Sequence, residues 1–162
     1  NNGTTIEAAG GFIKAQQQYN EWRATAHGRV MQCAKCHDPH YSVSGDKKNA
    51  IKTACLSCHA DRSVALNMQT VACESCHMPK AVVSQDSQGS GLYRTGDRAA
   101  HIWRIKTEAD PDALFTPDGS AVKKDTQGPF LTLNFSCLGC HNGRDARWYD
   151  FESVQQTSTL VH

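Results

Sequence analysis

The sequence lacks a long apolar run, an excess of charge of either sign and an abundance of aromatic side chains. Its 162 residues include 17 Lys plus Arg against 16 Asp plus Glu, and only 7% are aromatic. No stretch approaches the roughly 18 consecutive apolar residues of a membrane span, and no basic stripe of the kind that binds nucleic acid is present. We therefore expect neither a membrane span nor a nucleic-acid partner.

An initiator methionine and a charged-then-apolar leader are also missing, because the sequence begins at Asn1. Exported proteins lose such a leader when they mature. We therefore expect a processed, soluble chain.

Apolar residues are scarce for a chain that has to enclose a core. Hydrophobic residues make up 39% of the sequence, and the mean hydropathy is -0.54. The length fits one domain, and a domain of this size needs a buried core. We expect a single domain over residues 1–162, in which something other than Val, Leu and Ile supplies much of the core.

Cysteine, in contrast, is abundant and regularly spaced. All eight cysteines fall into four Cys-x-x-Cys-His motifs, so none is left over. The motif cysteines are Cys33, Cys36, Cys55, Cys58, Cys73, Cys76, Cys137 and Cys140, and the histidines that follow the pairs are His37, His59, His77 and His141.

This motif is the attachment pattern of haem c. Two thiols bond covalently to the porphyrin, and the adjacent histidine ligates the iron. Paired cysteines also build zinc sites, redox dithiols or disulfides, but none of these explains a histidine after every pair. We predict four haem c groups, held by the eight cysteines and ligated by the four motif histidines. Haem c is attached outside the cytoplasm, which predicts an exported protein.

One further histidine is available for each predicted haem. The four histidines outside the motifs are His27, His40, His101 and His162. This equality predicts bis-histidine ligation at every iron, which leaves no open position for a substrate. Methionine is the competing distal ligand, but the three Met residues are too few for four haems. Considered singly, each of these histidines also fits a plain surface or packing role.

The position of His40 limits which haem it can serve. It follows His37 by three residues, so the two Cα atoms are at most roughly 10 Å apart. Two histidines on opposite faces of one haem need a wider separation, so we expect His40 to ligate a different haem from His37. The alternative is a surface turn after Asp38-Pro39.

Regular structure is expected to be sparse. Residues 11–28 have helical spacing, with Gly28 as the expected end, and short helical turns are expected around the motifs. Segments 81–84 and 91–94 are candidates for a small hairpin. The predicted fold is mostly irregular coil with short α-helices and a minor hairpin, organised around a stacked chain of haems.

Several segments resemble multihaem c-type cytochromes of bacteria and archaea. They are the stretch from Tyr19 to His27, Cys36-His37-Asp38-Pro39-His40, Cys76-His77-Met78-Pro79, the stretch from Asp97 to Ile105 and the stretch from Phe130 to Ser136. With four haems, the chain is most similar to the OmcE-type tetrahaem cytochromes that polymerise into extracellular filaments. The resemblance implies a mostly irregular subunit, a continuous haem stack and a homopolymer. It also implies a histidine that ligates a haem of the neighbouring subunit, with His27 and His162 as candidates.

The predicted function is electron transfer without enzyme activity, to redox partner proteins or extracellular acceptors. The predicted location is extracellular or at the cell surface, and a soluble periplasmic carrier is the alternative. A competing interpretation is a subunit of a multihaem reductase acting on nitrite, hydroxylamine or a sulfur oxyanion. That activity needs a five-coordinate haem with acid, base or cationic groups beside it.

Overall fold

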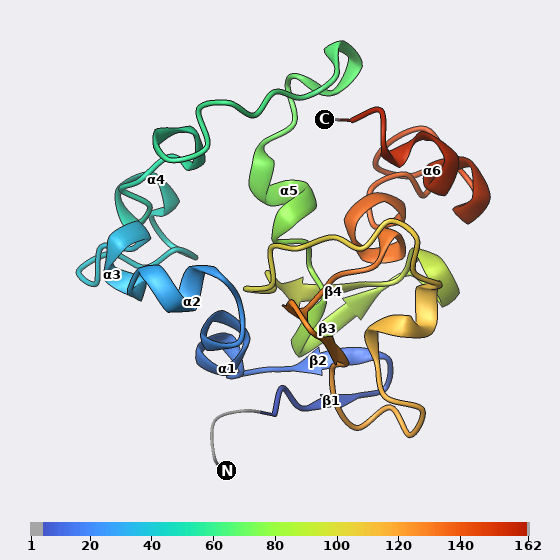
Figure 1. The fold of residues 1–162 in the computed structure, drawn as a ribbon, viewed down its shortest axis with the longest axis horizontal. Coiled ribbons are helices and arrows are strands. Elements are labelled where there is room, and N and C mark those ends of the chain that lie inside the picture. The colour runs from blue at the N-terminus through green and yellow to red at the C-terminus, as the bar shows by residue number, and fades with distance from the viewer. Residues whose placement is uncertain (1–4, 162) are drawn as a thin grey trace.

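The chain forms two unlike parts, a small β-sheet with an apolar core and an arc of short helices joined by loops (Figure 1). The computed structural model describes residues 5–161. We call residues 26–78 the arc, and residues 5–25 with 79–161 the sheet half. In this described part of the chain, no helix is long and apolar enough to cross a membrane.

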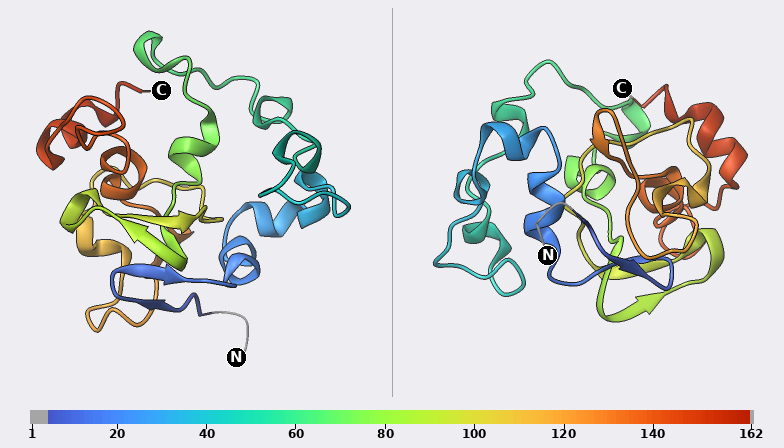
Figure 2. Two further views of the ribbon diagram at one scale, coloured as in Figure 1. Left: turned by 180° about the vertical axis from the view of Figure 1, so that it is seen from behind. Right: turned by 60° about the horizontal axis from the view of Figure 1, so that its bottom comes forward.

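The main sheet has four strands in the order β1-β2-β3-β4. They are β1 Ala8–Ala9, β2 Phe12–Lys14, β3 Val82–Gln88 and β4 Thr95–Arg98. β2 is antiparallel to β1 and parallel to β3, which in turn is antiparallel to β4. The β2–β3 pairing brings the N-terminal segment beside the chain that leaves the arc. The arc therefore begins and ends on the same sheet, as both views in Figure 2 show.

Apolar side chains from distant segments pack against this sheet. Ile13 and Val82 of the sheet are fully buried, together with Ile102, Leu114 and Leu131. Burial of such side chains away from water is the main favourable term in folding. The sheet half therefore has an ordinary protein core.

The helices are short and most lie in the arc. They are α1 Gln18–Arg23, α2 His27–Val30, α3 Cys33–Cys36, α4 Lys47–Ala50, η1 Cys55–Ser57, η2 Leu66–Met68, α5 Cys73–His77, η3 Gly91–Tyr93, η4 Pro111–Leu114, η5 Asn134–Leu138 and α6 Phe151–Ser158. A two-stranded pair, β5 Lys124–Asp125 with β6 Gly128–Pro129, completes the regular structure.

The single helix predicted over residues 11–28 is wrong. Its first part is β2, which pairs with β1 and β3, and its second part divides into α1 and α2. The Thr25 hydroxyl donates to the carbonyl of Trp22 at 2.7 Å and marks the break. Gly28 lies inside α2, where an added Cβ would collide with the Trp22 carbonyl. It therefore permits a close approach of two helices and does not end one.

The predicted hairpin is present but shifted. Its first strand is β3, whereas its second strand is β4 and not residues 91–94. Residues 91–93 form the short helix η3, and Gly89 adopts a positive φ of 73° in the connection. The connection, residues 89–94, therefore lies further along the chain than the sequence indicated.

The arc has almost no interior of its own. Of residues 26–78, Ala50 alone is buried. Local backbone hydrogen bonds order the arc, such as those from Asp38 N–H to the Ala50 carbonyl and from Lys52 N–H to the Cys36 carbonyl. Ala65 N–H also donates to the Val161 carbonyl at 2.9 Å, which ties the arc to the last described residue.

Candidate haem-binding sites

Each Cys-x-x-Cys motif lies on or beside a short helical turn. α3 carries the first motif, η1 the second, α5 the third and η5 the fourth. Side chains three residues apart on a helical turn lie on one face, so each turn presents its two thiols together. All eight cysteines are unpaired, which leaves every thiol available for attachment.

The fourth motif sits on a wider turn than the others. Gly139 N–H donates to the carbonyl of Asn134, five residues earlier, at 3.0 Å, which makes η5 a π-helical turn. Such turns occur mostly as single bulges at functional sites. Cys137 in this turn is half-buried against the cluster of Leu133, Leu138 and Val154, and burial raises its pKa to about 12.

Hydrogen bonds connect the segments that carry the first three motifs. Lys52 N–H donates to the Cys36 carbonyl at 3.0 Å, and Lys47 Nζ donates to the Glu74 carboxylate at 3.0 Å. Burial raises the pKa of the Cys55 thiol, and the nearby thiols of Cys73 and Cys36 raise it further. Burial likewise raises the pKa of Cys76, with a contribution from Cys140. α5 and η5, which carry the third and fourth motifs, contact each other directly.

His101 lies opposite the proximal histidine of the first motif. The ring centroids of His37 and His101 are 6.2 Å apart, with an angle of 42° between the ring planes. Burial, with a smaller contribution from His37, lowers the pKa of His101 to about 4. A neutral imidazole is the form that ligates metals, so this environment favours a ligand.

His27 occupies the same position relative to the second motif. Its ring centroid is 5.9 Å from that of His59, with an interplanar angle of 61°. Burial lowers the pKa of His27, and His59 adds to the effect. α2 begins at His27. The break between α1 and α2 therefore places the His27 ring opposite His59.

Both separations fit one iron atom between two imidazoles. Metal–imidazole bonds of about 2 Å on both sides of one ion, with a ring radius of about 1 Å on each side, place two axial centroids about 6 Å apart. His101 Nδ1 is buried and has no hydrogen-bond partner among the described residues, which is rare for a buried polar atom. The donor set and its spacing therefore fit haem at the first two motifs.

The proximal histidines of the last two motifs are oriented by backbone carbonyls. His77 Nδ1–H donates to the Trp103 carbonyl at 2.7 Å, and His141 Nδ1–H donates to the Arg147 carbonyl at 2.9 Å. Metal-bound histidines commonly donate their second ring nitrogen in this way, which fixes the tautomer. Nε2 of each ring is then the nitrogen that faces a metal.

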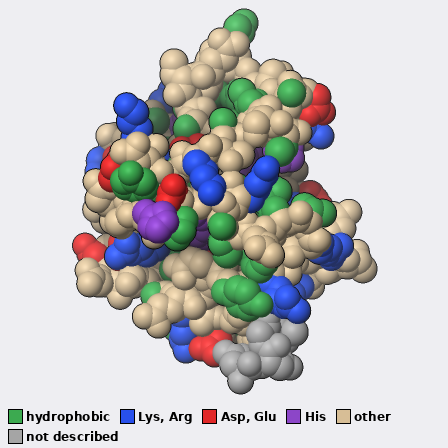
Figure 3. Space-filling model, turned by 90° about the vertical axis from the view of Figure 1, so that its left-hand side faces the viewer, with side chains coloured by type: hydrophobic (Ala, Val, Ile, Leu, Met, Phe, Trp, Pro, Cys, Tyr) green, Lys and Arg blue, Asp and Glu red, His purple; other side chains and the backbone are tan. Residues whose placement is uncertain are grey.

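Two predicted distal ligands remain. His40 is exposed, its backbone N–H donates to Asp38 at 3.0 Å, and its ring contacts no other described histidine ring. His162 lies outside the described residues. Their roles stay predictions. The arc side of the molecule exposes histidine side chains beside Lys and Arg, as Figure 3 shows.

The zinc alternative lacks a matching donor cluster. Within residues 5–161, no group of three or more His, Cys, Asp or Glu side chains is arranged to hold a metal ion. Two axial histidines with a porphyrin between them need no such cluster, because the porphyrin supplies the other ligands.

Two residues beside the proposed ligands, Glu21 and Trp103, have no recognisable motif in the sequence. Glu21 of α1 is fully buried, and its carboxylate accepts the backbone N–H of His101 at 2.5 Å. The Trp103 ring lies 4.4 Å from the His27 ring. A buried acidic position on an otherwise polar short helix is invisible in the sequence, because its partner is 80 residues away.

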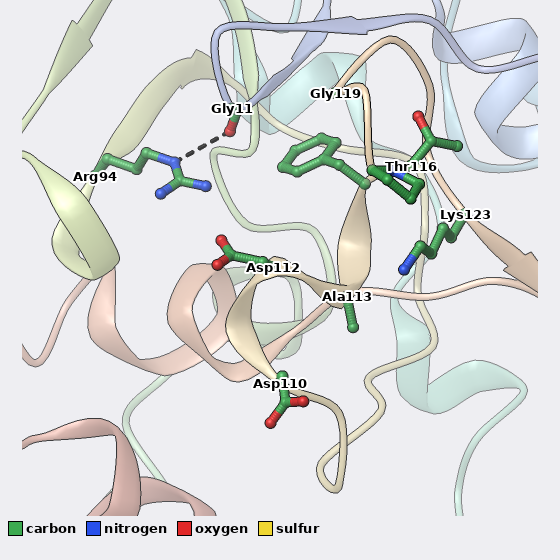
Figure 4. A pocket seen from close by; sticks show the side chains of 10 residues that line it. Gly11, Arg94, Asp110, Asp112, Ala113, Thr116, Gly119 and Lys123 are labelled. Carbon is green, nitrogen blue, oxygen red and sulfur yellow. Dashed lines mark hydrogen bonds between the residues drawn. The ribbon is translucent and has the colours of Figure 1, made fainter.

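One open cavity of about 580 Å³ lies in the sheet half (Figure 4). Its lining includes Arg94, which donates to the Gly11 carbonyl at 3.1 Å, with Asp110, Asp112 and Lys123. No Cys or His lines it. The cavity is therefore distinct from the predicted haem ligands.

Comparisons with known proteins agree with this geometry. A family model of the doubled CXXCH motif matches residues 27–64, which include His27 and the first two motifs. Among solved structures, the chain is similar to the octaheme sulfite reductase MccA, form II, of Wolinella succinogenes, with a TM-score of 0.59 and 22% sequence identity. That match covers 78% of this chain and 26% of the MccA chain. A search of curated proteins found no match.

These findings support a multihaem c-type cytochrome, and the predicted fold class is confirmed. The structure is mostly coil with short helices and small sheets, in a fold similar to that of a multihaem cytochrome. This chain spans about a quarter of the MccA chain, with 26% of it covered. MccA is an enzyme, which is in tension with our expectation of no enzyme activity, but at this identity the shared feature is the fold.

Proposed function

We propose that the chain transfers electrons through four covalently attached c-type haems, each with two histidine ligands. The observation that carries this proposal is the two pairs of facing imidazoles, at 6.2 Å and 5.9 Å, beside the first two attachment motifs. Bound haem iron supplies a one-electron redox couple, and two axial imidazoles leave it no open position.

The chain's own residues hold this system in place. The cysteine thiols anchor the haems, the imidazoles saturate the iron, and carbonyls or neighbouring rings fix the imidazole orientation. The hydrogen bonds between the segments of the first three motifs and the contact of α5 with η5 support a continuous order from the first haem to the fourth. We propose that all four haems belong to one domain over residues 1–162.

The proposal names the distal ligand of two haems. His101 serves the haem attached beside His37, and His27 serves the haem attached beside His59. We do not propose His27 as a ligand shared between subunits, because His59 of the same chain lies opposite it. His40 and His162 are proposed for the third and fourth haems, within the chain or across a subunit boundary.

We also propose that the chain forms an extracellular homopolymer in which the haem stack continues between copies. The resemblance to OmcE-type cytochromes supports this assembly, as does the exposure of His40, which leaves its ring accessible to a second copy. Electrons then pass to redox partner proteins or extracellular acceptors.

Three measurements on the native preparation test the function. Intact-mass spectrometry counts the haems, and low-temperature EPR of the oxidised protein reports their spin states. Negative-stain microscopy shows whether filaments are present. Four haems with only low-spin signals, in thin uniform filaments, are the expected result. Discrete particles would overturn the polymer and leave a soluble carrier.

Two substitutions test the ligand assignment. His101→Met and His27→Met should each convert one haem to His/Met ligation and raise its reduction potential. The effects should fall on different haems and add in the double variant. If both variants change the same haem, the assignment is wrong.

Reductase activity is the second candidate, favoured by the similarity to a solved sulfite reductase. It requires one iron with an open position. A substantial high-spin EPR signal that changes on addition of sulfite or nitrite would favour it over electron transfer alone.

A further inference from the structure

Trp103 is the point at which three of the four sites meet. Its ring centroid lies 4.4 Å from that of His27, at an interplanar angle of 47°, and 5.9 Å from that of His101, edge to face at 86°. Its carbonyl accepts the Nδ1–H of His77 at 2.7 Å. One residue therefore contacts the proposed distal ligands of the first and second haems and the proximal ligand of the third.

The backbone around Trp103 is anchored to the core of the sheet half. Ile102 is fully buried, and Ala100 N–H donates to the Pro79 carbonyl at 2.9 Å. On the other side, the Arg104 carbonyl accepts Leu131 N–H at 2.7 Å. Trp103 is thus fixed to the core of the sheet half, whereas two of the imidazoles that it contacts, those of His27 and His77, belong to the arc.

The other tryptophans of the chain have different surroundings. Trp148 is 54% exposed and its ring lies 6.2 Å from Tyr93, whereas Trp22 packs against Tyr19 at 5.7 Å. Neither has a histidine ring as its contact partner in those interactions. General packing by an aromatic residue therefore does not account for the three contacts of Trp103.

We propose that Trp103 is a positioning residue that sets the orientation of the distal imidazoles of the first and second haems together. This inference rests on the proposed electron-transfer function and on the two distal assignments. Residues in contact with a ligand fix its ring orientation and tune the metal. The angle between two axial imidazole planes in turn determines the EPR g-values of a low-spin ferric haem. Here those angles are 42° and 61° at the two sites.

The indole is tested separately from the carbonyl. Trp103→Leu and Trp103→Phe remove or reduce the ring but keep the main-chain acceptor for His77. EPR of the oxidised holoprotein should show shifted g-values for two low-spin haems and unchanged values for the others. Trp103→Phe, which retains an aromatic ring, should shift the same two signals less. Trp148→Phe is the matched control and should leave all signals unchanged.

Several outcomes would overturn the proposal. They are no shift in either Trp103 variant, a shift of all signals, or an equal shift in Trp148→Phe. If Trp103→Leu does not accumulate with a full haem content, Trp103→Phe decides alone, and an unchanged spectrum then means that the ring only packs. Failure of the proposed function is distinguishable, because it would show in the wild-type spectrum as a missing set of low-spin haems.

Discussion

The arc and the sheet half of this molecule differ in how many of their residues are buried. In the sheet half, residues such as Ile13, Ile102 and Leu131 are completely removed from water, whereas Ala50 is the only buried residue among residues 26–78 of the arc. Three of the four attachment motifs lie in the arc. A domain needs an apolar interior, so the haems have to supply the interior that the arc lacks.

Loss of the second attachment site should have the largest effect on this contrast. Replacing Cys55 and Cys58 together by Ala removes one haem and with it part of the interior of the arc. We expect amide hydrogen exchange to accelerate throughout the arc, while β2 and β3 stay protected. Leu56→Ala keeps both thiols and is the control. Equal deprotection of both halves would show that the arc and the sheet half unfold as one unit.

Truncation of a core side chain should have the second-largest effect. Leu131→Ala in the sheet half should cost about 2–5 kcal/mol of stability, because it leaves a cavity in a packed core. Leu66→Ala in the arc, where the side chain is 86% exposed, should change stability by only about 0.5 kcal/mol or less. Denaturation midpoints compare the two. A large loss at Leu66 would reveal that this side chain packs on a haem.

Removal of the Glu21 carboxylate should lower the stability less than Leu131→Ala does. Glu21 connects α1 to the segment of His101, and Glu21→Ala would leave a buried N–H without an acceptor, at a cost of about 1–3 kcal/mol. Glu21→Gln keeps an accepting oxygen and should retain most of the stability. Chemical denaturation of both variants is the measurement, and equal losses would show that the hydrogen bond contributes nothing specific.

The smallest effect is expected at an ion pair within the arc. Lys47 Nζ lies 3.0 Å from a Glu74 carboxylate oxygen, and the two side chains are 65% and 39% exposed. Such pairs contribute at most about 1 kcal/mol. Lys47→Ala should therefore alter the thermal midpoint slightly, and less at high salt. If Lys48→Ala changes the thermal midpoint equally, the effect comes from net charge and not from the Lys47–Glu74 ion pair.

The local chemistry of this protein was predictable from the sequence, whereas its long-range partners were not. The Cys-x-x-Cys-His motifs are contiguous, so their turns followed directly from spacing. The segment around Phe12 has a helical pattern, yet pairing with β3, about 70 residues away by register, makes it a strand. Counting histidines predicted distal ligands as a set. It did not predict which ring lies opposite His37 or His59, because those positions depend on the whole fold.

The placement of His101 opposite His37 also predicts an order in which the proposed sites are completed. The second site takes both of its proposed ligands from within residues 27–59, but the first site joins a residue of the arc to one far downstream. Closing the longer loop costs more chain entropy and requires the later segment to be present. As the chain emerges N-terminus first, the second proposed site would have both of its ligands while the first still lacks residue 101. The haem nearest the start of the chain would then gain its sixth ligand after its neighbour does.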